Sequence, residues 1–145
     1  MFFGKKTSRP QNRIDTLIGA GTRIDGNITF SGGLRIDGHV KGNISAEAGQ
    51  SGTLVLSEPA RVDGEIRVSH VVINGKVMGP VYATEYAELQ PKAHVTGDVH
   101  YKTVEMHLGA IVEGKLVYQE NGVVVHTPPL AKESKENNGG ERVAD

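Results

Sequence analysis

The stretch Ile73-Asn-Gly-Lys-Val-Met-Gly-Pro-Val81 contains one five-residue pattern twice: an aliphatic residue, any residue, glycine, any residue, and a second aliphatic residue. Eight of the 19 glycines are flanked in this way, and they are Gly26, Gly38, Gly42, Gly64, Gly75, Gly79, Gly97 and Gly114. Because Ile, Val and Leu are roughly a quarter of the residues, random placement would produce the pattern only about once. The pattern therefore indicates a repeated structural unit.

Around these glycines, aliphatic residues occupy alternate positions, as from Leu34 through Ile36 to Val40, with mostly polar residues between them. This is the two-residue period of strands with one buried face. With one glycine taken per unit, the intervals from Gly26 to Gly114 are 16, 22, 15, 18 and 17 residues. The sequence predicts an all-β fold, a single-stranded parallel β-helix of about six rungs with about 17 residues each. We expect the repeat glycines to mark corners where backbones approach closely.

Composition divides the chain into three regions. We expect a basic and aromatic arm over 1–13, the β-helix domain over 14–126, and a tail over 127–145 that lacks apolar periodicity, with both termini flexible. No apolar run is long enough for a transmembrane helix. The absence of Cys excludes disulfides and thiolate metal sites and suits a reducing cytoplasm. A net charge of −1 gives no overall attraction to nucleic acid, which is not an expected partner.

The two end rungs of such a stack have unpaired strand edges, which are templates for further pairing unless they are capped. The sequence shows no capping helix at either end. We therefore predict end-to-end self-assembly. The candidate polymer contacts are Leu17 and Ile18 at one end and Tyr118, Val123, Val124 and Val125 at the other.

The repeat region resembles the bactofilins, a family of bacterial polymer-forming cytoskeletal proteins. The similarity covers residues 14–116 and is clearest in Val71-Val-Ile-Asn-Gly-Lys-Val77 and the chain of glycine patterns. The resemblance implies a right-handed β-helix that joins head to head and tail to tail into non-polar filaments without nucleotide or metal. It also implies a scaffold on the inner face of the cytoplasmic membrane that serves cell shape or localises peptidoglycan-modifying enzymes. One departure is the interval of 22 residues after Gly42, which contains a loop-like insertion over 46–52.

The start of the chain is similar to the short membrane-targeting segment of many bactofilins. The candidate membrane-binding residues are Met1, Phe2, Phe3, Lys5 and Lys6. Each apolar side chain would contribute about 1.5–3 kcal/mol if fully removed from water, and each Lys about 1 kcal/mol near an anionic leaflet. A single arm binds marginally, whereas a filament with many arms gains avidity. We expect a cytoplasmic protein peripheral to the inner membrane.

Three histidines, His94, His100 and His107, come nearest to a metal cluster. Each neighbours a core position, so each should face outward, and their positions in the repeat differ. No metal site and no cofactor are expected. Acidic residues precede four repeat glycines, but without the nine-residue register of calcium-binding β-rolls. These four are Asp25, Asp37, Asp63 and Glu113.

The alternative is an enzyme, the left-handed β-helix of hexapeptide-repeat acyltransferases or γ-class carbonic anhydrases. Their rungs of 18 residues place an aliphatic residue every six, whereas the glycine patterns here are spaced by 12, 4, 22, 11, 4, 18 and 17 residues. No G-x-S-x-G nucleophile motif and no phosphate-binding G-x-x-x-x-G-K-[ST] motif occurs. The favoured interpretation is a non-enzymatic scaffold.

Overall fold

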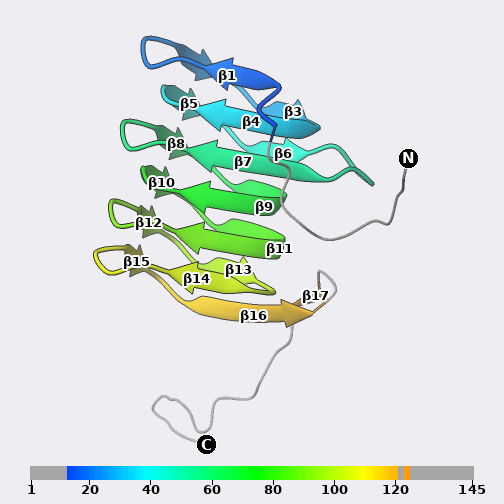
Figure 1. Ribbon diagram of the computed structural model, residues 1–145, viewed down its shortest axis with the longest axis vertical. Coiled ribbons are helices and arrows are strands. Elements are labelled where there is room, and N and C mark those ends of the chain that lie inside the picture. The colour runs from blue at the N-terminus through cyan, green and yellow to red at the C-terminus, as the bar shows by residue number, and fades with distance from the viewer. Residues whose placement is uncertain (1–12, 121–122, 125–145) are drawn as a thin grey trace, which may run out of the picture.

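Six rungs of chain stack along the long axis of the molecule, each adding strands to three faces (Figure 1). The computed structural model describes residues 13–120 and 123–124, and within them it contains strands and no helix. Of the predicted arm over 1–13 the structure describes only residue 13, and the whole of the predicted tail over 127–145 lies outside the described residues. The prediction of a parallel β-helix with about six rungs is confirmed.

The first face is formed by β1 (Thr16–Ile18), β4 (Gly32–Ile36), β7 (Gly52–Leu56), the second half of β9 (Ile66–Ile73), the second half of β11 (Val81–Leu89) and β14 (Val104–Met106). The second face is formed by β2 (Arg23–Asp25), β5 (His39–Lys41), β8 (Arg61–Asp63), β10 (Lys76–Met78), β12 (His94–Thr96) and β15 (Ile111–Glu113). The third face is formed by β3 (Ile28–Phe30), β6 (Ile44–Ala46), the first halves of β9 and β11, β13 (Val99–Tyr101) and β16 (Leu116–Glu120).

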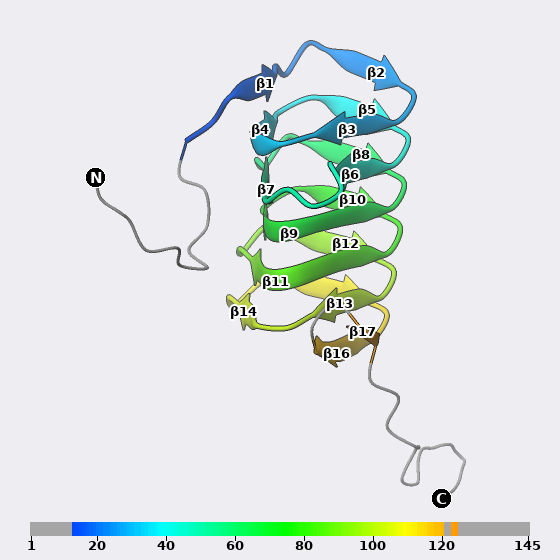
Figure 2. The same ribbon diagram turned by 90° about the vertical axis from the view of Figure 1, so that its right-hand side faces the viewer.

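Strands of one face pair with the same face of the next rung, and all of these pairs are parallel. Figure 2 shows the second and third faces stacked in this way. The short strand β17 (Val123–Val124) differs, because it pairs antiparallel with the end of β16. Strands β9 and β11 run from the third face round the corner into the first, so both faces belong to one sheet.

The core consists of columns of equivalent aliphatic residues that the rungs bring into register. On the second face, Val40, Val62, Val77 and Val95 follow one another and are all 0% exposed. Ile36, Leu56, Ile73 and Leu89 on the first face, and Ile44, Ile66, Val81 and Val99 on the third, form similar columns that are also 0% exposed. Outward positions between them are mostly polar, so the alternation in the sequence corresponds to one buried face per strand.

Six of the repeat glycines form a column at the corner between the second and third faces. Gly64 has a φ of +156°, and a Cβ there would lie 2.1 Å from the carbonyl oxygen of Gly42 in the rung before. In the same way, a Cβ at Gly79 would lie 2.3 Å from the carbonyl oxygen of Gly64, and a Cβ at Gly97 would lie 2.6 Å from that of Gly79. Only glycine combines this backbone with so close an approach, which confirms the predicted role of the corner.

The other two glycine patterns, centred on Gly38 and Gly75, lie at the corner between the first and second faces. A Cβ at Gly75 would lie 2.5 Å from the Ser57 carbonyl oxygen, so the approach is again close. At this corner the second and fourth rungs place three residues between core positions, and the others place five. This difference shortens two intervals, and the loop over 47–51 between β6 and β7 lengthens another, so the rungs are regular although their lengths vary.

Candidate assembly surfaces at the two ends

The N-terminal end of the rod is the first rung, formed by β1, β2 and β3. Each pairs with the second rung on one side, and no described strand pairs with its other side. Ile24, Ile28 and Phe30 occupy core columns but are only partly buried, whereas Val40 and Ile44 in the next rung are 0% exposed. These residues occupy the same column positions, so the difference in exposure arises because no further rung covers the first one.

The C-terminal end is the sixth rung. Met106 is 43% exposed and Leu116 is 45% exposed, although Leu89 and Val99, their partners in register in the fifth rung, are 0% exposed. Tyr118 is 46% exposed and makes an edge contact with the Tyr101 ring at 6.2 Å between centroids. The sixth rung therefore presents the end of the hydrophobic core to solvent.

One corner of this end is closed by the chain itself. Strand β17 pairs with Gln119 and Glu120 at the end of β16. Gln119 is 2% exposed, and its amide nitrogen donates to the Ala83 carbonyl at 3.4 Å. Among the described strands, β14 and β15 have no partner strand on the side that faces away from the fifth rung. Two of the three faces therefore keep an open edge at this end.

The sequence-predicted contact residues have different positions in the structure. Leu17 is 58% exposed but pairs with Arg35, an outward position, whereas Ile18 is 7% exposed. Tyr118 lies at the open C-terminal end. The side chains of Val123 and Val124 and the whole of Val125 lie outside the described residues, as do Met1, Phe2, Phe3, Lys5 and Lys6.

Sequence reasoning missed most of the C-terminal surface. Of the eight large apolar side chains that are exposed among the described residues, five belong to the sixth rung, namely Met106, Leu108, Ile111, Leu116 and Tyr118. The signal was present, because Met106 and Leu116 occupy core positions of the last repeat unit. A residue at a core position of the last rung has no further rung to cover it, so it lies on the end surface. The correct rung count shows which residues these are.

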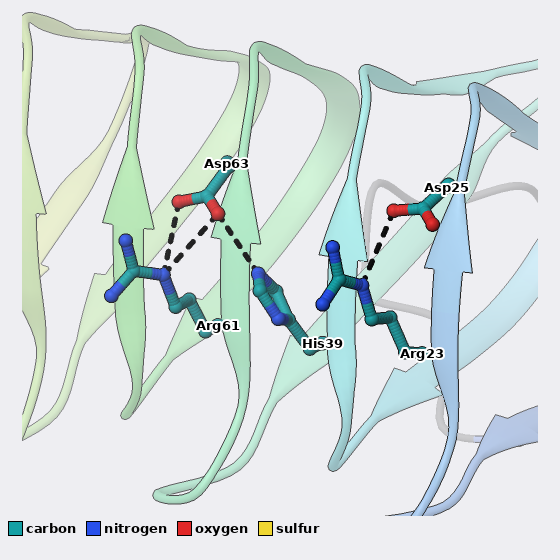
Figure 3. A network of polar contacts seen from close by, with 5 residues as sticks. All are labelled: Arg23, Asp25, His39, Arg61 and Asp63. Carbon is teal, nitrogen blue, oxygen red and sulfur yellow. Dashed lines mark hydrogen bonds and ion pairs between the residues drawn. The ribbon is translucent and has the colours of Figure 1, made fainter.

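Paired charged side chains lie on the outer side of the second face (Figure 3). The Arg23 and Arg61 guanidinium groups contact Asp25 at 3.3 Å and Asp63 at 3.0 Å in their own strands. His39 Nε2 lies 2.8 Å from Asp63 Oδ2 in the next rung. This hydrogen bond, followed by that from Arg61, lowers the pKa of Asp63 below its usual value. These charged groups of the second face are thus paired with near neighbours.

The three candidate histidines lie on different faces. His94 Nε2 is 3.4 Å from Glu113 on the second face, and the His100 ring stacks on Tyr82 on the third, with 4.3 Å between centroids. His107 lies at the end of β14 and contacts Glu88 and Glu105. The three do not meet at one site.

Comparison with known proteins gives these ends a context. A family model described as the polymer-forming cytoskeletal bactofilin domain matches residues 16–117. The chain belongs to the bactofilin family. This bactofilin is 31% identical to BacO of Myxococcus xanthus over 114 residues, which cover 79% of the chain and 85% of BacO. It is 28% identical to BacP of the same organism over 116 residues, which cover 80% of the chain and 47% of BacP, about half of that relative's length.

No solved structure matches this bactofilin. In the described part of the chain, no helix is long and apolar enough to cross a bilayer. Because the family is cytoskeletal and forms polymers, the two open ends are the candidate sites of subunit contact. Membership also favours the structural interpretation over the hexapeptide-repeat enzyme.

Proposed function

We propose that this bactofilin polymerises through its two end rungs into non-polar, membrane-associated filaments, without nucleotide or metal. The observation that carries the proposal is the exposure of core-column residues in the sixth rung. Met106 and Leu116 are 43% and 45% exposed where the same columns one rung earlier are 0% exposed. The end rung of a second copy would cover these side chains and pair with the open edges of β14 and β15.

Identical ends meeting each other would make the filament non-polar. A twofold axis perpendicular to the rod would bring two sixth rungs together with their edge strands antiparallel, and a second such axis would join two first rungs. Each contact is then isologous, and alternation of the two contacts continues without limit. Covering the exposed half of each large apolar side chain would stabilise a contact by about 1 kcal/mol per side chain.

The N-terminal arm completes the proposed function. Met1, Phe2 and Phe3 would insert at the membrane surface while Lys5 and Lys6 contact anionic headgroups. A filament would display many arms on the inner face of the cytoplasmic membrane and act as a non-enzymatic scaffold. The scaffolded partners follow from the family resemblance as proteins of cell shape, such as peptidoglycan-modifying enzymes.

The test is negative-stain electron microscopy of the full-length protein in EDTA without nucleotide. We expect thin filaments from the wild type, and only dimers joined through their first rungs from Met106→Asp, because a carboxylate cannot be buried at the contact without a partner. Met78→Asp is the matched control, since Met78 is also 43% exposed but lies on the side of the rod. It should form normal filaments.

Leu116→Asp repeats the test at a second position, and circular dichroism checks that each variant is folded. Long filaments from folded Met106→Asp and Leu116→Asp would reject the end contact. Compact trimers from the wild type would reject polymerisation and support the hexapeptide-repeat alternative.

A further inference from the structure

Two glutamates lie directly opposite each other on the outer side of the first face, where the fifth and sixth rungs pair. Glu88 in β11 and Glu105 in β14 are partners in register. Like charges directly opposite in a sheet are destabilising. Among the described residues, neither carboxylate forms an ion pair with Lys or Arg, and both contact the His107 ring nitrogen. The pair therefore needs compensation from a proton or a cation.

His107 points its ring nitrogen at both glutamates. His107 Nε2 lies 3.0 Å from Glu88 Oε2 and 3.3 Å from Glu105 Oε2. One donor atom from each of the three residues lies within 4.8 Å of the other two. Ligand atoms at about 2.0–2.2 Å from one tetrahedral zinc ion are themselves roughly 3.3–3.6 Å apart. The two distances from His107 Nε2, 3.0 Å to Glu88 and 3.3 Å to Glu105, are slightly below or at the lower end of this range.

The surrounding side chains hold the glutamates in place. The Tyr86 hydroxyl donates to Glu105 Oε1 at 2.7 Å and lies 3.5 Å from Glu88 Oε1. Burial, and then the hydrogen bond to Glu105, raise the pKa of the Tyr86 phenol, so that it stays protonated and donates. Gln90 Nε2 donates to Glu88 Oε2 at 3.3 Å. Such outer hydrogen bonds are typical partners of metal-binding carboxylates.

We propose that Glu88, Glu105 and His107 bind a divalent transition-metal ion of the zinc type. Two carboxylates and an imidazole suit zinc or cobalt, whereas calcium and magnesium prefer oxygen ligands alone. The side chains of Glu105 and His107 are 56% and 37% exposed, which leaves access for the ion and for water as a further ligand. The expectation of no metal site rested on the histidines together, whereas this candidate site combines His107 with Glu105 of its own rung and Glu88 of the rung before.

An ion bound at this site would connect the fifth rung to the sixth. The sixth rung is the one whose outer edge has no partner strand on two faces. The ion would therefore stabilise the C-terminal end of the rod. Polymerisation in EDTA does not depend on it, because the end contacts proposed above use other residues. Binding and assembly can be tested separately.

The experiment is equilibrium dialysis of metal-stripped full-length protein against ZnCl₂, followed by elemental analysis of zinc per chain. We expect about one zinc per wild-type chain and at least a tenfold weaker affinity for Glu105→Gln and His107→Ala, because loss of even an outer hydrogen-bonding partner of a ligand weakens metal binding about 10–100-fold. His94→Ala is the matched control, because His94 pairs with only one carboxylate, Glu113. Its affinity should equal that of the wild type.

A second measurement follows the thermal unfolding midpoint, which zinc should raise in the wild type and in His94→Ala but not in His107→Ala. Three results would overturn the proposal. They are no zinc on the wild type, equal zinc on the wild type and His107→Ala, or magnesium binding as tight as zinc, which would indicate only an acidic surface.

Discussion

At the scale of single residues, the hydrogen atom that serves as the side chain of Gly64 lets two rungs approach closely. A Cβ would lie 2.1 Å from the Gly42 carbonyl oxygen, and the φ of +156° is itself unfavourable for other residues. Backbone strain costs about 1–3 kcal/mol and overpacking about 1–3 kcal/mol. Gly64→Ala should therefore lower the free energy of unfolding by about 2–6 kcal/mol, measured by urea denaturation in the Leu116→Asp background, which forms dimers and no filaments, at one fixed protein concentration.

Gly49→Ala separates the two contributions to this loss. Gly49 also has a left-handed φ of +77°, but a Cβ there meets no atom within 4 Å. Its substitution should cost only the backbone strain, about 1 kcal/mol. Equal losses for the two variants would show that the close approach between rungs contributes nothing to the requirement for glycine.

At the scale of elements, neighbouring strands β5 and β8 are linked across rungs by the hydrogen bond between His39 and Asp63. This bond, with that from Arg61, lowers the pKa of Asp63 in the folded state. A lowered pKa means that the stabilisation is present above the unfolded value of about 4 and is lost as the pH falls through the folded value. Asp63→Asn should cost up to about 1 kcal/mol at pH 7, and the difference from wild type should disappear between about pH 5 and pH 2.

Asp25→Asn is the control for this element, because Asp25 makes an equivalent contact with Arg23 but its side chain is 67% exposed, against 26% for Asp63. Unfolding midpoints between pH 2 and pH 8 should match those of the wild type for this variant. If Asp63→Asn showed the same pH profile as Asp25→Asn, the contact between strands would have no part in acid stability.

The elements also show what the sequence could predict. The two-residue period and the regular glycine spacing are visible in the sequence itself. Val40 and Val62 were therefore predicted correctly as core residues, and Gly64 as a corner residue, from their spacing. The two corner lengths were missed, because Gly38 and Gly75 share the same five-residue pattern while lying at another corner. The pairing of Glu88 with Glu105 depends on register between rungs. The offset between partners changes from 18 residues at Ala83 and Tyr101 to 17 at Ala87 and Val104, which spacing alone does not reveal.

At the scale of the whole molecule, the fold separates two surfaces with different chemistry. The sides carry locally paired charges such as Arg61 with Asp63, whereas the ends expose core columns such as Met106 and Leu116. A rod with polar sides and apolar ends favours growth in one dimension over lateral aggregation. In the proposed assembly, filament length would be set by the two end contacts, and attachment to a membrane would depend on the number of arms that the filament carries.

This coupling gives a last prediction, on vesicles of anionic phosphatidylglycerol. Phe2→Ser with Phe3→Ser should leave filaments intact by electron microscopy but release them from the vesicles in flotation, because the apolar part of each arm is lost. Leu116→Asp keeps the arm but limits assembly to dimers, so its flotation should also fall by tenfold or more through lost avidity. Neutral phosphatidylcholine vesicles control for the charge of Lys5 and Lys6 and should bind the wild type more weakly. Undiminished flotation of the double Phe variant would exclude the arm as the anchor, whereas undiminished flotation of Leu116→Asp dimers would show that attachment does not depend on filament length.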